Sequence, residues 1–513
     1  MRTKKIFLNM FFDIMPYLLI GIVGLIKVNY LIKYIGDVGN GYYQFITQVI
    51  SYVFLAQAGF SEAVTYSLYK PFADNNKKDI NKIYSGARYI FKIIGLIILG
   101  IIFVVSLGLY FYYGNDPYRN SAIICFAVIS VSYLIAYFGK TQTYGAILIA
   151  NQEKYLYSIV FNSMKLICDI LTIFVIVKFR SLESIAILIF IIKVIEEIVM
   201  RIFIKRKYGW LEEVEEKNTS MAKMTKDLVW LQIGYLVLNN IDAILLMFFV
   251  GPVAVSIYTS YNYILRYLGE VTSRANLASV SSFGNVFAKK ENNRAFKLFK
   301  ELQGLFIIIA ISVCLTFMVG IRSFIMIWIK DINYILNYKT IILFTLTLFF
   351  TIIYYPLLSI VNANGLFKDN KKHTFICAFV NVLLSVILIQ YYEINGVLMG
   401  TIISFIINIY LKCSLLKKKV FTDLRLLKLL IPYISSSLVF IVLAYLSKYA
   451  EYYLLFSLDS ILLCVVMLGL IFLFVLVITF TVMYLTNPYT VNLLDRIVNL
   501  LKRNRLKNNK KIA

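Results

Sequence analysis

The sequence has one histidine, six cysteines and few acidic residues, and each scarcity argues against a class of protein. His373 stands in a lysine-rich stretch without a nearby histidine or cysteine, so a zinc site built on it is not expected. The cysteines form no CxxC pair and lie in or beside apolar runs, as small buried side chains do. No Walker A motif, glycine-rich phosphate loop or nucleophile–base set occurs. We therefore predict a protein that is not an enzyme, with no metal and no cofactor.

Apolar residues are abundant: they make up 60% of the 513 residues, and the mean hydropathy is +0.78. This composition lies far outside the range of soluble globular proteins. The first apolar run follows RTKK, as in a signal peptide, but it contains Lys27 and is followed by no small-residue cleavage site. We expect this run to be a retained membrane span.

Fourteen apolar segments are long enough to cross about 30 Å of hydrocarbon as helices. This number predicts an all-α integral membrane protein with 14 transmembrane helices. The segments are 12–34, 42–68, 89–113, 120–148, 156–178, 182–204, 226–250, 253–281, 298–321, 340–363, 373–391, 395–416, 427–447 and 460–486.

Positive charge alternates between the two sides of this topology. Of the 52 Lys and Arg residues, 37 fall on the side that holds both termini and only eight on the other. Since cytoplasmic loops of membrane proteins are rich in Lys and Arg, both termini are predicted to lie on the cytoplasmic side of the membrane. This topology, with anionic inner-leaflet lipid, accounts for the net charge of +25 without a nucleic-acid partner.

The sequence repeats itself weakly at an offset of 215 residues. Gly36 falls on Gly251, Tyr43 on Tyr258, and at nearly the same offset Asn151 falls on Asn364. A match that persists through several helices and loops predicts two copies of one helical bundle, as in duplicated membrane transporters.

The repeat and the longest connection predict the domain organisation. We expect an N-terminal lobe at 1–205, a cytoplasmic linker at 206–225, and a C-terminal lobe at 226–418. Two further helices would occupy 419–490 and a basic tail 491–513. The linker carries Trp210 and an acidic EEVEE cluster, which favours an amphipathic surface helix.

Charged residues inside the spans are expected to be paired or to face water, because each costs about 3 kcal/mol at the middle of a membrane. On segment 156–178, Lys165 and Asp169 stand one turn apart, which favours a local pair. On segment 182–204, Lys193 stands one turn before Glu196 and Glu197, which favours another.

Four intramembrane cations have no obvious partner in the sequence. Lys27 has no acid nearby, Lys140 has none within one turn, and Arg266 and Arg274 share Glu270 on one face of segment 253–281. We predict that Lys27, Lys140, Arg266 and Arg274 form a cationic cavity between the lobes that binds an anion such as phosphate. Glu62, Asp242 and Glu270 are candidate cavity acids for coupling to a proton or sodium gradient.

Three stretches resemble the polysaccharide exporters of the multidrug/oligosaccharidyl-lipid/polysaccharide (MOP) superfamily. They are YLIKYIGDVGNGYYQFITQVISYVFLAQAGFSEAVTYSL, ILIANQEKYLYSIVFNSMKLICDIL and IDAILLMFFVGPVAVSIYTSYNYI. The resemblance implies two pseudo-symmetric six-helix lobes in a V shape, as in MATE transporters, plus two C-terminal helices. It maps the family's cavity cations to Lys27, Arg266 and Arg274, and an acidic position to Asp242.

The resemblance implies a flippase for an undecaprenyl-pyrophosphate-linked oligosaccharide, which works by alternating access in capsule, O-antigen or exopolysaccharide synthesis. It also implies that the membrane is the bacterial plasma membrane. The implied partners are the lipid-linked oligosaccharide, membrane lipids, a polysaccharide polymerase and a chain-length regulator. Two alternatives stay open. A multidrug or organic-cation extruder of the same superfamily would favour an acidic or apolar cavity. A polysaccharide polymerase would need a large external loop with catalytic groups, and the sequence offers none.

Overall fold

The computed structural model describes residues 2–491 apart from 55, 115, 289–291, 455–459 and 490. The predicted basic tail lies outside the described residues except for Val491. Every regular element in the described part is helical. Ten of its helices are long and apolar enough to span a membrane by length and composition. The predicted all-α membrane fold is confirmed.

The chain divides into two compact units, residues 1–260 and residues 261–513. Within the first unit α1 packs on α6, α4 packs on α3 and α7, and α2 packs on α5 and α8. The helices are α1 (Arg2–Val53), α2 (Ala56–Ala73), α3 (Lys77–Tyr113), α4 (Arg119–Phe138), α5 (Thr141–Ala150), α6 (Lys154–Phe179), α7 (Leu182–Lys207), α8 (Met221–Phe249) and the start of α9 (Pro252–Ala288).

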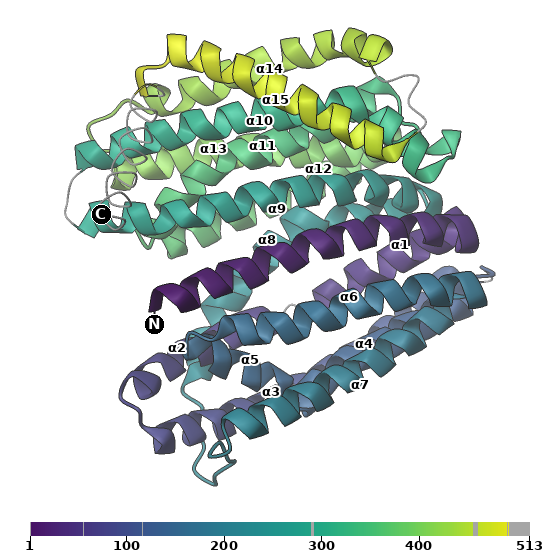
Figure 1. Cartoon of the computed structure of the whole chain (residues 1–513), viewed down its shortest axis with the longest axis vertical. Helices are drawn as coiled ribbons and strands as arrows, with labels where there is room; N and C mark the ends of the chain where they lie inside the picture. The colour runs from purple at the N-terminus through teal and green to yellow at the C-terminus, as the bar shows by residue number, and fades with distance from the viewer. Residues whose placement is uncertain are drawn as a thin grey trace, which may run out of the picture. The chain divides into compact units, whose positions relative to one another are not determined.

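In the second unit, α10 and α11 form the core, and α14 and α15 lie along α10 (Figure 1). In the most apolar stretch of α10, 78% is buried inside the protein. In the most apolar stretch of α15, only 6% is buried. An all-round apolar helix with so little protein cover is suited to face lipid. Besides the rest of α9 the helices are α10 (Asn292–Ile329), η1 (Ile332–Tyr334), α11 (Tyr338–Ala363), α12 (Phe367–Tyr392), α13 (Ile394–Lys419), α14 (Leu426–Leu454) and α15 (Ile461–Thr486).

Each of the fourteen predicted segments coincides with a helix or with parts of two helices, but three boundaries differ. The first two segments are joined in α1, which kinks at Gly36, where φ is 86°. The second segment is broken after Val53, where α1 ends, and resumes in α2. The segment 120–148 is broken between Phe138 and Thr141. Gly139 and Lys140 stand at that break, so Lys140 begins a helix instead of lying within one.

The internal repeat is visible in the backbone. Gly36 and Gly251, which the 215-residue offset superposes, both have positive φ, 86° and 120°. Adding 213 to the bounds of α6 gives Phe367 and Tyr392, the bounds of α12. The residues that follow these two helices, Arg180 and Glu393, again both have positive φ, 50° and 48°. The predicted duplication is therefore carried by turns and helix lengths, although few side chains match.

The connection between α7 and α8 contains no helix, so the predicted amphipathic helix is wrong. Residues 208–220 are turns, bends and irregular backbone. Their backbone groups bond instead to α3: the Asn218 N–H donates to the Lys82 carbonyl at 3.1 Å, and the Val214 N–H to Ser85 Oγ at 2.8 Å. The division into six-helix lobes stays a prediction, since the two compact units divide within α9.

Candidate functional site

The charged stripe predicted on segment 253–281 lies on α9, in the second unit. Arg266 and Glu270 are exposed on the protein surface and Arg274 is half-buried. Tyr263 and Tyr267 stand on the same helix with their rings 4.8 Å apart. Since the three charged residues are spaced by four, they lie along one face of the helix. This face combines two guanidinium groups, one carboxylate and an aromatic pair.

Lys27 has an acid partner, contrary to the prediction. Its Nζ lies 2.5 Å from Asp169 Oδ1 on α6, which packs against α1. Both side chains are largely buried, with exposed fractions of 18% and 10%. The predicted local pair between Lys165 and Asp169 is wrong, because Asp169 turns toward α1 and no described residue forms an ion pair with Lys165. Asp169 therefore forms its ion pair with a lysine on another helix instead of with the lysine one turn away on its own helix.

The local pair predicted on segment 182–204 is confirmed for Lys193 and Glu196, whose charged atoms lie 2.7 Å apart on α7. Glu197 interacts with other groups than Lys193. It accepts hydrogen bonds from the backbone N–H groups of Lys140 and Thr141, at 2.7 and 3.1 Å, and pairs with Arg201. A carboxylate at these N–H groups satisfies the free donors at the start of α5. Glu197 therefore stabilises the break between α4 and α5.

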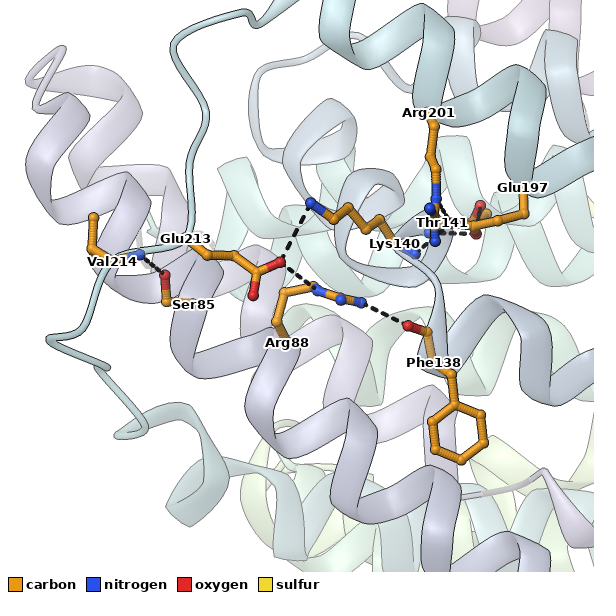
Figure 2. A network of polar contacts seen from close by, with 9 residues as sticks. All are labelled: Ser85, Arg88, Phe138, Lys140, Thr141, Glu197, Arg201, Glu213 and Val214. Carbon is orange, nitrogen blue, oxygen red and sulfur yellow. Dashed lines mark hydrogen bonds and ion pairs between the residues drawn. The ribbon is translucent and has the colours of Figure 1, made fainter.

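Lys140 also has a partner, supplied by the connection between α7 and α8. Its Nζ lies 3.3 Å from Glu213 Oε1, and the same oxygen accepts from Arg88 Nε of α3 at 3.3 Å (Figure 2). Arg88 also donates to the Phe138 carbonyl at the end of α4, at 3.3 Å. The Glu213 carboxylate thus holds the connection against α3 and against the α4–α5 break at once.

The charge balance at Glu213 favours its ionised form. Burial alone would raise the pKa of this carboxyl group, but the positive charges of Arg88 and Lys140 outweigh burial and lower the pKa below its ordinary value of 4.5. Nothing in the acidic EEVEE stretch distinguished Glu213 from its neighbours. Its role depends on Arg88 and Lys140, which are 125 and 73 residues away in sequence.

The candidate acids differ in their surroundings. Asp242 on α8 is buried and accepts a hydrogen bond from the Tyr258 hydroxyl at 2.6 Å. Adding 215 to 27 gives 242, so Lys27 and Asp242 are repeat-related positions of opposite charge. Tyr43, the repeat mate of Tyr258, lies beside Lys27, with its ring centroid 6.0 Å from Nζ. Glu62 on α2 is exposed, as is Glu270.

The predicted site residues fall into both compact units. Lys27, Lys140 and Asp242 belong to the first, and Arg266 and Arg274 to the second. A single chamber containing all four cations stays a prediction, as do the substrate-binding and ion-coupling roles. Within the described residues, no cluster of three or more His, Cys, Asp or Glu side chains is suited to hold a metal ion.

No family model matches the chain, and no curated protein sequence matches it. Solved structures do. The lipid II flippase MurJ in an inward closed conformation is 16% identical over 93% of this chain and 99% of that chain, with a TM-score of 0.70. An inward-facing multidrug resistance MATE family transporter of the MOP superfamily is 12% identical over 80% of this chain and 99% of that chain, with a TM-score of 0.63.

A third solved structure has a similar fold. It is a MOP superfamily transporter from Pyrococcus furiosus whose binding pocket is described as reversed in polarity. It is 12% identical over 81% of this chain and 96% of that chain, with a TM-score of 0.55. At these identities the likeness shows the fold. The chain is a multi-pass membrane protein with the all-helical fold of the MOP-superfamily transporters.

Proposed function

We propose that this protein is a flippase that carries an undecaprenyl-pyrophosphate-linked oligosaccharide across a bacterial plasma membrane by alternating access. The finished polymer would be a capsule, O-antigen or exopolysaccharide. Both termini would lie in the cytoplasm. The observation that carries the proposal is the exposed charged face of α9 within a membrane-transporter fold.

The exposure of Arg266 and Glu270 indicates whether this face of α9 contacts lipid or water. A charged side chain that pointed into lipid from the middle of a span would cost about 3 kcal/mol or more. Two such residues on one face, with Arg274 one turn further, are tolerated where the face lines water. We infer that α9 lines the transport cavity.

The chemistry of this face suits a phosphorylated sugar. Guanidinium groups bind phosphate oxygens through paired hydrogen bonds, and Arg266 and Arg274 provide two of them two turns apart. Tyr263 and Tyr267, whose hydroxyls lie 3.3 Å apart, offer aromatic faces and hydroxyls to sugar rings. The likeness in fold to a lipid II flippase supports the same class of substrate.

The multidrug or organic-cation extruder is the second candidate, because one observation favours it. Lys27 and Lys140 both have acid partners, Asp169 and Glu213, so two of the four predicted cavity cations are already neutralised. An organic cation would be admitted more readily by a less positive cavity. The MATE likeness in fold fits this alternative as well.

A lipid analysis of cells that lack the gene tests the proposal. The flippase account expects an undecaprenyl-pyrophosphate oligosaccharide to accumulate in the cytoplasmic leaflet, and the masses of its sugars would identify the cargo. Normal lipid-linked intermediates together with increased sensitivity to cationic drugs would favour the extruder. Unpolymerised repeat units at the outer surface would instead favour a polymerase.

A further inference from the structure

Lys412 on α13 is a buried lysine that has no acid partner among the described residues. Its exposed fraction is 0%, and its Nζ has no hydrogen-bond partner among the protein atoms of the described residues. Among the described residues, no carboxylate forms an ion pair with it. Asp369, the acid near the start of α12, is paired with Lys419 at 2.7 Å. The charge of Lys412 is therefore not balanced by the protein.

Lys412 faces a polar strip between α12 and α13, which we call the α12–α13 seam. Lys412 interacts electrostatically with His373 and Cys377 of α12. Three further polar atoms in the seam also have no hydrogen-bond partner among the described residues: His373 Nδ1, Asn381 Oδ1 and Asn408 Oδ1. Since Asn408 precedes Lys412 by four residues, both lie on the same face of α13.

The two helices pack closely at the other end of the seam. A Cβ atom added to Gly396 would lie 2.4 Å from the Leu388 backbone, and one added to Gly400 would lie 2.3 Å from Ser385 Oγ. Thr401, the next residue, accepts a hydrogen bond from Asn381 Nδ2 at 3.0 Å. The close packing thus ends near Asn381, where the unpartnered polar atoms begin.

We propose that the α12–α13 seam binds ordered water around Lys412, forming a buried hydrated site between two membrane-spanning helices. A buried polar atom without a partner costs about 1–3 kcal/mol, and four of them on one seam need a ligand. The ligand must accept from the ammonium group and donate to the two carboxamide oxygens. Water does both, and buried water typically makes about three hydrogen bonds to such groups.

Water fits better than an ion. An anion would satisfy Lys412 but would leave the Asn381 and Asn408 oxygens without donors. A metal cation would be repelled by the ammonium group. The inference does not depend on the proposed transport function, because it rests on burial and hydrogen-bond balance within the second unit alone.

X-ray radiolysis of the purified full-length protein in detergent tests the site. Irradiation generates hydroxyl radicals from bound water, and mass spectrometry locates the oxidised side chains. Cys377 and Cys314 are both fully buried, but the Cys314 thiol faces the Thr345 carbonyl, away from the seam. We expect Cys377 to be oxidised severalfold faster than Cys314. Equal, slow oxidation of both thiols would overturn the proposal without any variant.

Two substitutions and one added ion sharpen the result. Lys412→Met is expected to slow the oxidation of Cys377 severalfold, whereas Lys417→Met, at an exposed position on the same helix, should leave the rate unchanged. An unchanged rate in Lys412→Met would contradict the central role of Lys412. Inorganic phosphate should not protect Cys377, and protection by phosphate would replace the water site with an anion site.

Discussion

The repeat-related hairpins α6–α7 and α12–α13 have helices of the same length, 26 residues each. They differ in whether their buried charged side chains have ion-pair partners. In α6–α7 the buried carboxylates of Asp169 and Glu196 are paired with Lys27 and Lys193. In α12–α13, Lys412 is fully buried and has no carboxylate partner among the described residues.

The difference shows that the same helical hairpin can hold a buried charge in two ways, with an ion-pair partner or without one. An ion pair such as Lys27–Asp169 fixes α6 against α1. Loss of one partner strongly destabilises the folded protein, because the other charge stays buried and unpaired. A lysine hydrated by water, as we infer for Lys412, contributes little to helix packing. The first repeat is therefore expected to depend on its charges for stability more than the second.

The largest effect is expected from Asp169→Leu. It leaves Lys27 buried without an acid, which should lower the free energy of unfolding by about 3 kcal/mol. Lys412→Met, in the other hairpin, should change it by less than about 1 kcal/mol, because it removes a donor that is bound to water. Denaturant titration of both variants in detergent measures the difference.

The double variant Lys27→Met/Asp169→Leu controls for packing. Replacing both partners removes the unbalanced charge, so most of the lost stability should return. If the double variant is no more stable than Asp169→Leu, or if Lys412→Met is the more damaging single change, the contrast between the two hairpins is wrong.

A smaller effect is expected from Gly86→Ala on α3. A Cβ atom there would lie 2.0 Å from the Asn218 carbonyl oxygen, so the connection between α7 and α8 must shift. Overpacking of this kind costs about 1–3 kcal/mol. Gly100→Ala on the same helix meets nothing within 4 Å and serves as the control. Faster tryptic cleavage after Lys217 in Gly86→Ala, but not in Gly100→Ala, is the expected result.

The smallest effect is expected from Glu213→Gln, because the side chain of Glu213 is 43% exposed. The loss in stability should stay below about 1 kcal/mol. Hydrogen exchange at the Val214 amide, which donates to Ser85 Oγ, should nevertheless quicken. Glu212→Gln, which changes an exposed neighbour, should have no such effect and is the matched control.

The same attachment has a predictable pH dependence. The pKa of Glu213 is lowered in the folded protein, so its ionised form stabilises the attachment above the ordinary value of 4.5. This stabilisation is lost as the pH falls through the lower folded-state pKa. Protection of the Val214 amide should therefore stay constant from neutral pH to about 4.5 and fall below that value. A loss of protection near neutral pH would assign the attachment to another group.

The sequence predicted the helices and the duplication well because both are encoded locally. Apolar runs set the spans, and the positive-φ positions Gly36 and Gly251 recur at a fixed offset. The pair Lys193–Glu196 was predictable for the same reason, since its partners stand one turn apart. The sequence could not predict the partner of a charged residue when that partner lies on a different element of the chain.

Lys27, Lys140 and Lys412 illustrate this limit. Lys27 and Lys140 have no acid within one turn, and their partners, Asp169 and Glu213, are 142 and 73 residues away. Lys412 is the first residue of the basic stretch KCSLLKKK and looks like one more loop cation, yet α13 continues to Lys419 and buries Lys412. Tertiary packing decides whether a lysine is paired, exposed or, as we propose for Lys412, hydrated.

The most direct test of the proposed function is a flipping assay with the purified protein in proteoliposomes that contain a fluorescent undecaprenyl-pyrophosphate oligosaccharide. The account predicts that the wild-type protein moves the lipid between leaflets, and that Arg266→Gln/Arg274→Gln abolishes the movement. Arg294→Gln, at an exposed position of α10, should retain it. Undiminished flipping by Arg266→Gln/Arg274→Gln, or uptake of organic cations without any lipid movement, would contradict the account.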